Sequence, residues 1–178
     1  GFAVMLVGLG SYAFLGQPDI ALNSLTGPST TNYPALVALL ARQMPQRPGD
    51  IEGWALLGRG YLALGQPAQA AKAFQHAVDV VKSEQGAAPP ALLSSYGEAL
   101  AEMSGQVTQE AEAVFREALS EDPKDMTARY YMGFALMARN DREQALQTWE
   151  GLLADAPPDV PWRNTLVDQV ALLKDQTG

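Results

Sequence analysis

The sequence predicts an all-α fold in which helical hairpins stack one after another. Three observations predict it. Alanine and leucine are abundant while β-branched residues are sparse, apolar residues recur three or four positions apart, and glycine and proline divide the chain into similar segments. A chain of 178 residues is long enough for one domain with a substantial core.

The composition excludes several classes of function. The chain has 12 basic and 20 acidic residues and a net charge of −8, which disfavours nucleic acid and anionic lipid headgroups as partners. It has no cysteine, so disulfides, thiolate metal sites and thiol catalysis are absent. With His76 as the one histidine, no usual zinc or haem site can form, and we expect no metal and no cofactor.

Residues 1–16 form an uncharged apolar run that we expect to be the end of a transmembrane anchor helix. As a helix the run spans about 24 Å, less than the roughly 30 Å of a bilayer core. A buried helix of a soluble domain and a cleaved signal peptide are the alternatives. The first basic residue of the chain is Arg42, and a flank without lysine or arginine is typical of the outer side. In a Gram-negative bacterium this side of the inner membrane is the periplasm.

Residues 17–33 are rich in turn-forming and polar residues and are predicted to be a linker. The helical domain is expected to occupy residues 34–178, beginning with a short helix over 34–44.

The first hairpin is predicted over residues 51–82. Trp54, Leu57 and Tyr61 lie on one face of its first helix, and the sequence Gly65-Gln66-Pro67 separates that helix from the second. A glycine inside a helix costs roughly 1 kcal/mol, so Gly58 needs a structural reason. We expect Gly58 to lie against Ala70, so that two small residues let the helices approach closely.

The same pattern recurs over residues 90–123 and 126–157, and a capping helix is predicted over 160–174. Thr108, Asp125 and Asp141 each precede a predicted helix as N-caps. Trp-x2-Leu-Gly-x2-Tyr followed by Ala-x3-Phe is the tetratricopeptide (TPR) pattern, so the fold class is a superhelical solenoid of three hairpins with flanking helices. The residues that match the pattern are Trp54, Leu57, Gly58, Tyr61, Ala70, Phe74, Gly97, Ala111, Phe115, Pro123, Gly133, Ala145, Trp149 and Pro157.

In TPR stacks the first helices of the hairpins line a concave peptide-binding groove. The candidate peptide-binding residues at the corresponding positions are Arg59, Leu62, Ser94, Glu98, Glu102, Tyr130, Phe134 and Met137. Tyr130, Phe134 and Met137 form an apolar stripe that fits either a bound amphipathic helix or packing beneath the terminal helix.

No catalytic residues are predicted. His76 is expected on the exposed side of its helix as an ordinary surface residue. Glu98 and Glu102 are four residues apart, and paired carboxylates can act as acid and base. On a helix such a pair more often lies on a surface exposed to water. Because the two residues are at positions that line the groove in TPR stacks, binding of a partner is a third interpretation.

The order of these features resembles the CcmI/CycH family of cytochrome c maturation proteins. The resemblance is carried by "YAFLGQPD", "PGDIEGWALLGRGYLALGQPAQAAKAF" and the segment from "AEAVFREALSEDPKD" to "LLADAPPDVPW". It implies a periplasmic TPR domain tethered to the inner membrane through its N-terminal helix. Such a domain would bind the C-terminal helix of apocytochrome c and present it to the other proteins of the haem-ligation complex. The alternatives are another periplasmic TPR scaffold, in envelope or pilus assembly, and the accessory domain of an enzyme.

Overall fold

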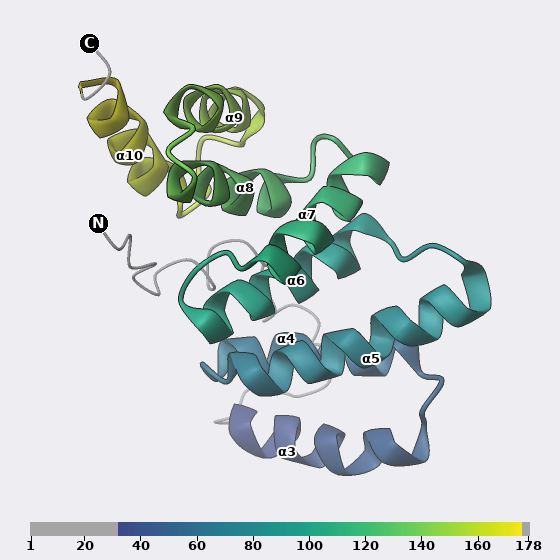
Figure 1. Cartoon of the computed structure of the whole chain (residues 1–178). Helices are drawn as coiled ribbons and strands as arrows, with labels where there is room; N and C mark the ends of the chain where they lie inside the picture. The colour runs from purple at the N-terminus through teal and green to yellow at the C-terminus, as the bar shows by residue number, and fades with distance from the viewer. Residues whose placement is uncertain (1–31, 176–178) are drawn as a thin grey trace.

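The computed structural model describes residues 32–175, and these residues form an all-helical stack (Figure 1). The expected membrane anchor and nearly all of the expected linker, residues 1–31, lie outside the described residues. Between residues 32 and 175 no helix is long and apolar enough to cross a membrane. The helices are α3 (Tyr33–Gln43), a 3₁₀ helix η1 (Met44–Gln46), α4 (Ile51–Ala63), α5 (Pro67–Gln85), α6 (Pro90–Ser104), α7 (Gln109–Glu121), α8 (Met126–Ala138), α9 (Arg142–Asp155) and α10 (Arg163–Asp175).

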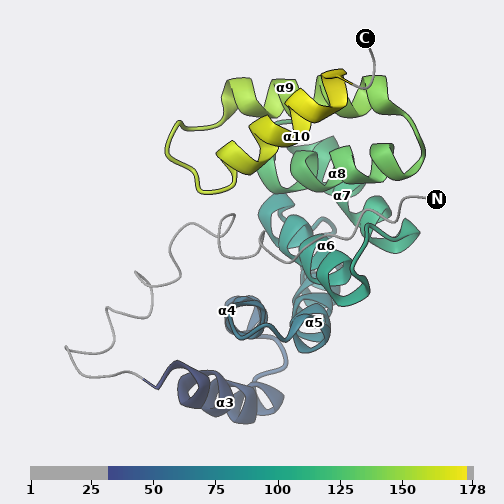
Figure 2. The ribbon, with the colours of Figure 1, turned by 90° about the vertical axis from the view of Figure 1, so that its left-hand side faces the viewer.

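Consecutive helices pair as hairpins: α4 with α5, α6 with α7, and α8 with α9. The hairpins follow one another through contacts of α5 with α6 and of α7 with α8, so the chain advances along a single axis. Helix α3 lies at one end of the stack and α10 at the other (Figures 1 and 2). This arrangement is the predicted solenoid of three hairpins with flanking helices.

The ends of the helices follow the sequence signals. The predicted N-caps are confirmed: the side chains of Thr108, Asp125 and Asp141 accept hydrogen bonds from the backbone N–H three residues on, at 3.2, 2.8 and 3.4 Å. Gly65, with φ of 66°, makes the turn between α4 and α5, a conformation that other residues rarely adopt. Pro67 then occupies the first turn of α5, where its missing N–H is not needed.

Asp125→Ala is expected to lower the free energy of unfolding by about 1 kcal/mol, because the N–H of Ala128 at the start of α8 loses its acceptor. Urea unfolding followed by circular dichroism measures the change. Asp125→Asn, which keeps a side-chain oxygen at the cap, is the matched control and should lose less than half as much. Equal losses for both variants would show that the cap hydrogen bond is not the cause.

Each hairpin is closed by an aromatic ring that lies on the glycine of the facing helix. A Cβ atom added to Gly58 would lie 2.7 Å from the Phe74 ring, and one added to Gly97 would lie 2.6 Å from Phe115. In the third hairpin a Cβ on Gly133 would lie 2.0 Å from Nε1 of Trp149. The side chain nearest to the position of the missing Gly58 Cβ is therefore Phe74, while the expected contact was with Ala70. Ala70 is fully buried, but the space that the missing side chain leaves is filled by the ring one turn further along α5.

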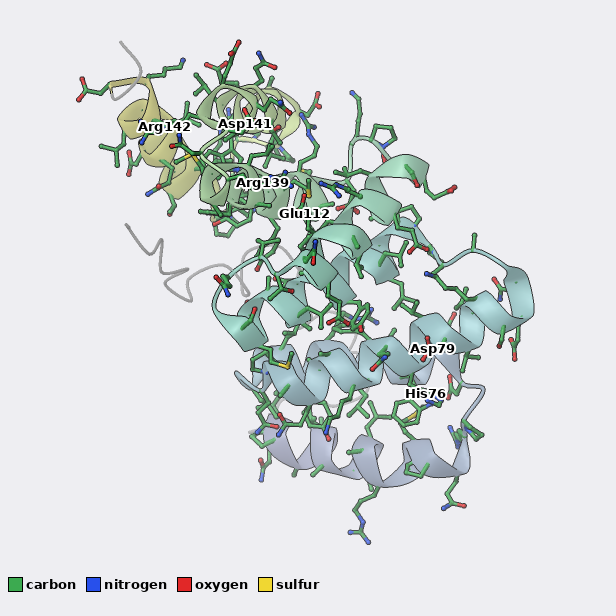
Figure 3. The ribbon with its side chains drawn as sticks, viewed as in Figure 1. His76, Asp79, Glu112, Arg139, Asp141 and Arg142 are labelled. Carbon is green, nitrogen blue, oxygen red and sulfur yellow. The ribbon has the colours of Figure 1, made fainter. Side chains whose placement is uncertain are left out.

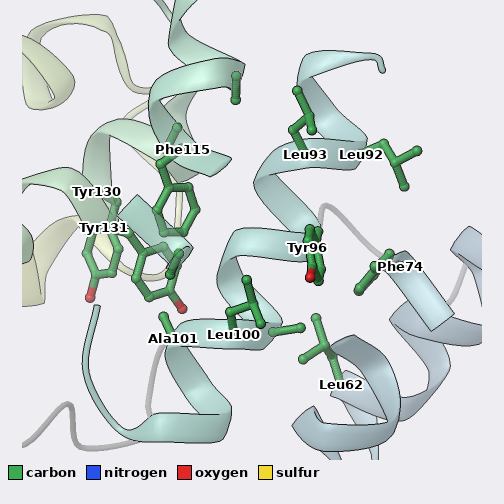
Figure 4. Packing of buried hydrophobic residues seen from close by; sticks show 14 of the residues in the cluster. Leu62, Phe74, Leu92, Leu93, Tyr96, Leu100, Ala101, Phe115, Tyr130 and Tyr131 are labelled. Carbon is green, nitrogen blue, oxygen red and sulfur yellow. The ribbon is translucent and has the colours of Figure 1, made fainter. Parts of the chain in front are cut away.

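A continuous apolar core runs from α4 to α10, and Figure 4 shows its central part. Phe74, Phe115 and Trp149 are among its largest fully buried side chains, each from the second helix of a hairpin. Burying a side chain of this size contributes roughly 2–3 kcal/mol, so the closing rings are major sources of stability. The second helices thus supply the closing rings, and the first helices carry the glycines that accommodate them.

Flanking helices cover both ends of this core. At the N-terminal end, Val37 of α3 packs beside Gly60 of α4, where an added Cβ would lie 2.9 Å from it. At the C-terminal end, α10 packs against α9. The buried side chains on this side are Trp162, Leu166, Val170 and Leu173. Because each end is covered, the stack leaves neither terminal hairpin with its apolar side open to water.

Ion pairs join residues of different helices. Lys82, at the position where the TPR pattern closes with a proline, forms an ion pair with Glu117 of α7 at 2.7 Å. Arg129 of α8 pairs with Asp155 at the end of α9, also at 2.7 Å. Partly exposed pairs of this kind contribute at most about 1 kcal/mol each, so they orient the hairpins more than they stabilise them.

Candidate peptide-binding site

The first helices of the three hairpins, α4, α6 and α8, pack in sequence, α4 against α6 and α6 against α8. All eight candidate peptide-binding residues lie on these helices, and we call the set the inner face. It consists of Arg59 and Leu62 on α4, Ser94, Glu98 and Glu102 on α6, and Tyr130, Phe134 and Met137 on α8.

Burial divides the inner face into two groups. Four of its side chains are in the interior: Leu62 and Glu98 are 1% exposed, Ser94 is 2% exposed and Tyr130 is 8% exposed. The others, Arg59, Glu102, Phe134 and Met137, are half-buried. Surface that a partner can contact is therefore offered mainly by the half-buried group, and the buried group supports it from below.

Glu98 is buried, so the expectation that Glu98 and Glu102 form a solvated pair of carboxylates is wrong for Glu98. Helix α6 packs against α4, α5, α7 and α8, and every residue from Leu92 to Ala101 is buried, so the carboxyl lies in the interior of the stack. Burial, and then the neighbouring Glu102 carboxylate, raise the pKa of Glu98 well above its ordinary value of 4.5. The Tyr131 hydroxyl, acting as a hydrogen-bond donor, lowers this pKa without outweighing the burial.

The apolar stripe of α8 is shared between the core and the surface. The Tyr130 ring contacts Phe134 edge-on at 5.1 Å between centroids and Trp162, just before α10, at 6.1 Å. Phe134 in turn contacts the Trp149 ring at 4.9 Å. Tyr130 thus belongs to the packing beneath the terminal helix, which was one of the two predicted interpretations. Phe134 and Met137 keep part of their surface exposed.

Arg59 provides a positive charge at the α4 end of the inner face. Burial lowers the pKa of its guanidinium from the ordinary value of 12.5, and the nearby Tyr33 of α3 opposes this effect. An arginine remains charged despite such a shift. The inner face therefore carries a cation on α4, a carboxylate on α6 and an apolar patch on α8.

His76 is not the ordinary surface residue that the sequence indicates. Its Nε2 atom lies 2.8 Å from the carbonyl oxygen of Pro48, and its ring lies 4.2 Å from the Trp54 ring. Figure 3 shows it on α5, one turn before Asp79. His76 thus ties the turn before α4 to α5. The two residues that hold the His76 ring are more than 20 positions away in the sequence. Helical periodicity does not reveal contacts over that separation.

A second cluster was not predicted at all. Glu112 of α7 is nearly buried and forms ion pairs with Arg116, one turn along, and with Arg139 at the end of α8 (Figure 3). The i,i+4 spacing of Glu112 and Arg116 is the signal that the sequence offers for half of this cluster. The pairing with Arg139 joins the second and third hairpins by connecting α7 with the end of α8.

The chemistry that this arrangement supports is binding. Among residues 32–175, no group of three or more His, Asp or Glu side chains is arranged to hold a metal ion. The inner face offers aromatic and thioether surface next to a carboxylate, a combination suited to one side of an amphipathic helix.

Comparison with known proteins identifies relatives of this solenoid. Residues 24–163 match the family model described as the cytochrome c-type biogenesis protein H TPR domain. The chain is 28% identical over 171 residues to the cytochrome c-type biogenesis protein CycH of Rhizobium meliloti, covering 94% of the chain and 44% of that protein. It is 29% identical over 165 residues to CycH of Pseudomonas aeruginosa, covering 92% of the chain and 39% of that protein. It is 30% identical over 166 residues to CycH of Bradyrhizobium diazoefficiens, covering 89% of the chain and 44% of that protein.

The chain spans less than half the length of each of these relatives. Among solved structures, the crystal structure of MamA superposes with a TM-score of 0.65 at 15% sequence identity, covering 82% of this chain and 79% of that one. At this identity the likeness concerns the fold alone, and it supports the assignment as a TPR solenoid.

Proposed function

Because the chain belongs to the family of the cytochrome c-type biogenesis protein H TPR domain, we propose that it serves c-type cytochrome maturation as a protein-binding module. The names of its relatives and the all-helical solenoid support this role. A domain of this kind contributes surface for recognition, and the chemistry of haem attachment belongs to its partners.

The client that we propose is the C-terminal helix of apocytochrome c, which the module holds and presents to the other haem-ligation proteins. The observation that supports this client is the half-exposed pair Phe134 and Met137 of α8, in the same inner face as the Glu102 carboxylate of α6. Phe134 and Met137 contact the apolar side of the client helix, and Glu102 faces a basic residue on its polar side. Burial of about 600 Å² on each partner, less the cost of ordering, gives micromolar affinity.

The proposed setting is the periplasm of a Gram-negative bacterium. The uncharged run of residues 1–16 anchors the module in the inner membrane, and residues 17–33 form the linker from the membrane to the domain. A tether of this kind keeps the module near the site where unfolded cytochromes emerge from the membrane.

Phe134→Ala is expected to weaken binding of a synthetic C-terminal apocytochrome c peptide at least tenfold, because the exposed edge of the ring is lost. Calorimetric titration measures the affinity, and circular dichroism should show unchanged helical content. Phe134 also contacts Trp149, so Met137→Gln serves as a second variant that removes apolar surface without touching that ring. The full apocytochrome should bind more tightly than the same protein with haem attached.

The matched control is Leu39→Ala, which removes an apolar side chain that is 51% exposed on α3, at the N-terminal end of the stack. This variant should bind the peptide as the unmodified chain does. Wild-type affinity for both Phe134→Ala and Met137→Gln would place the binding surface elsewhere. Equal affinity for the apo and haem-bound cytochromes would contradict the proposed client.

A further inference from the structure

Two buried polar side chains on α6, Ser94 and Glu98, are poorly supplied with hydrogen bonds: the Tyr131 hydroxyl lies near the Glu98 carboxyl, but neither side chain makes a hydrogen bond of good geometry within the described residues. Ser94 and Glu98 lie one helical turn apart, and the Ser94 Oγ atom and both carboxyl oxygens of Glu98 are without a hydrogen bond of good geometry. Most buried polar groups in folded proteins are paired, because an unpaired one costs about 1–3 kcal/mol. A site that leaves two such groups adjacent is suited to receive a donor from another molecule.

The surroundings of Glu98 define the kind of donor. The groups that act on it are Glu102, one turn further along its own helix, and Tyr130 and Tyr131 of α8. None of these carries a positive charge. The Tyr131 ring is stacked on Phe115, with centroids 5.2 Å apart and planes 7° from parallel (Figure 4). This stacking holds the ring whose hydroxyl interacts with the Glu98 carboxyl.

We propose that the α6 polar row, Ser94, Glu98 and Glu102, receives a lysine or arginine side chain from the helix that binds the inner face. This inference rests on the proposed function, because it assigns one contact within that complex. Glu102 is half-buried and is the most exposed member of the row. A long basic side chain passes Glu102 with its aliphatic stem against the tyrosine rings and ends at Glu98 and Ser94.

The incoming cation replaces a proton. Burial raises the pKa of Glu98 and so favours the neutral form of its carboxyl in the unbound chain. When the ammonium or guanidinium of the client approaches, the carboxylic acid ionises, the ion pair forms and one proton passes to solvent. Binding therefore releases up to about one proton per complex, at a pH where the unbound carboxyl holds its proton.

Calorimetric titration with the apocytochrome c peptide, in two buffers of equal pH and different ionisation enthalpy, counts these protons. We expect net proton release with the unmodified chain and none with Glu98→Gln, whose affinity should also fall about tenfold. A peptide in which the contacting basic residue is replaced by glutamine should bind Glu98→Gln and the unmodified chain equally. Glu143→Gln, on the exposed first turn of α9, is the matched control and should leave both affinity and proton release unchanged.

The outcomes separate this inference from the function on which it rests. Peptide binding without proton release, or proton release that persists in Glu98→Gln, overturns the cation subsite and leaves the client-binding role intact. Absence of peptide binding to the unmodified chain overturns both. Urea unfolding of Glu98→Gln verifies that the variant is folded, so a lost signal cannot be assigned to unfolding.

Discussion

Gly133→Ala is expected to lower the free energy of unfolding by about 3 kcal/mol. The added Cβ would lie 2.0 Å from Nε1 of Trp149, a distance that no pair of unbonded heavy atoms tolerates. The Trp149 ring cannot move freely, because it is 2% exposed and its N–H donates to the carbonyl oxygen of Tyr130 at 3.0 Å. Forced rearrangement of a packed core typically costs about 1–3 kcal/mol, and here a buried hydrogen bond is lost as well.

The matched control is Gly151→Ala on α9. Its Cβ would meet only the end of the Arg129 side chain, at 2.7 Å, and this flexible group can shift. Alanine is the better helix former by roughly 1 kcal/mol, so Gly151→Ala should be neutral or stabilising. Urea unfolding of both variants measures the difference. If Gly133→Ala is as stable as the unmodified chain, the Trp149 ring does not pack directly on Gly133 in the third hairpin.

Glu98→Gln is expected to change how stability depends on pH. The pKa of Glu98 is raised in the folded chain, so above its ordinary value of 4.5 the folded state keeps a proton that the unfolded state has lost. Stability therefore falls as pH rises from 4.5 towards the folded-state pKa, by up to about 1.4 kcal/mol per pH unit. Glutamine has no proton to lose, so the variant should gain stability relative to the unmodified chain as pH increases.

Urea unfolding at several pH values between 4.5 and 8 provides the measurement. The two stability curves should diverge steadily as pH rises, with Glu98→Gln the more stable protein at the alkaline end. Glu143→Gln on α9 is the control, and its curve should run parallel to that of the unmodified chain. Parallel curves for Glu98→Gln would mean that the Glu98 carboxyl is ionised in the folded chain.

The hairpins were predictable because their signals are local. Trp54, Leu57 and Tyr61 define one helix face, Gly65 and Pro67 define the break, and a cap such as Asp125 defines where a helix begins. These signals act over one or two helical turns, which is the range that periodicity reports. The ring that lies on the hairpin glycine was not singled out, because periodicity gives the face of a helix but not which side chain of the opposite helix fills a space.

The candidate site was predictable in position and less so in character. TPR periodicity assigned eight residues to the first helices of the hairpins, and the structure has all eight on α4, α6 and α8. It did not reveal that Glu98 is buried, because carboxylates four apart resemble a solvated face until the packing of four other helices around α6 is known. The contact of Glu112 with Arg139 depends on how two hairpins meet, and no pattern within either hairpin contains that information.

The closing rings also bear on how the chain acquires its structure. Each glycine lies only 16 residues before its ring in the first and third hairpins and 18 in the second. Contacts at such short separation form with little loss of chain entropy, so each hairpin is a unit that can nucleate on its own. The three units then assemble by neighbour-to-neighbour docking, and growth of the solenoid can begin at any one of them.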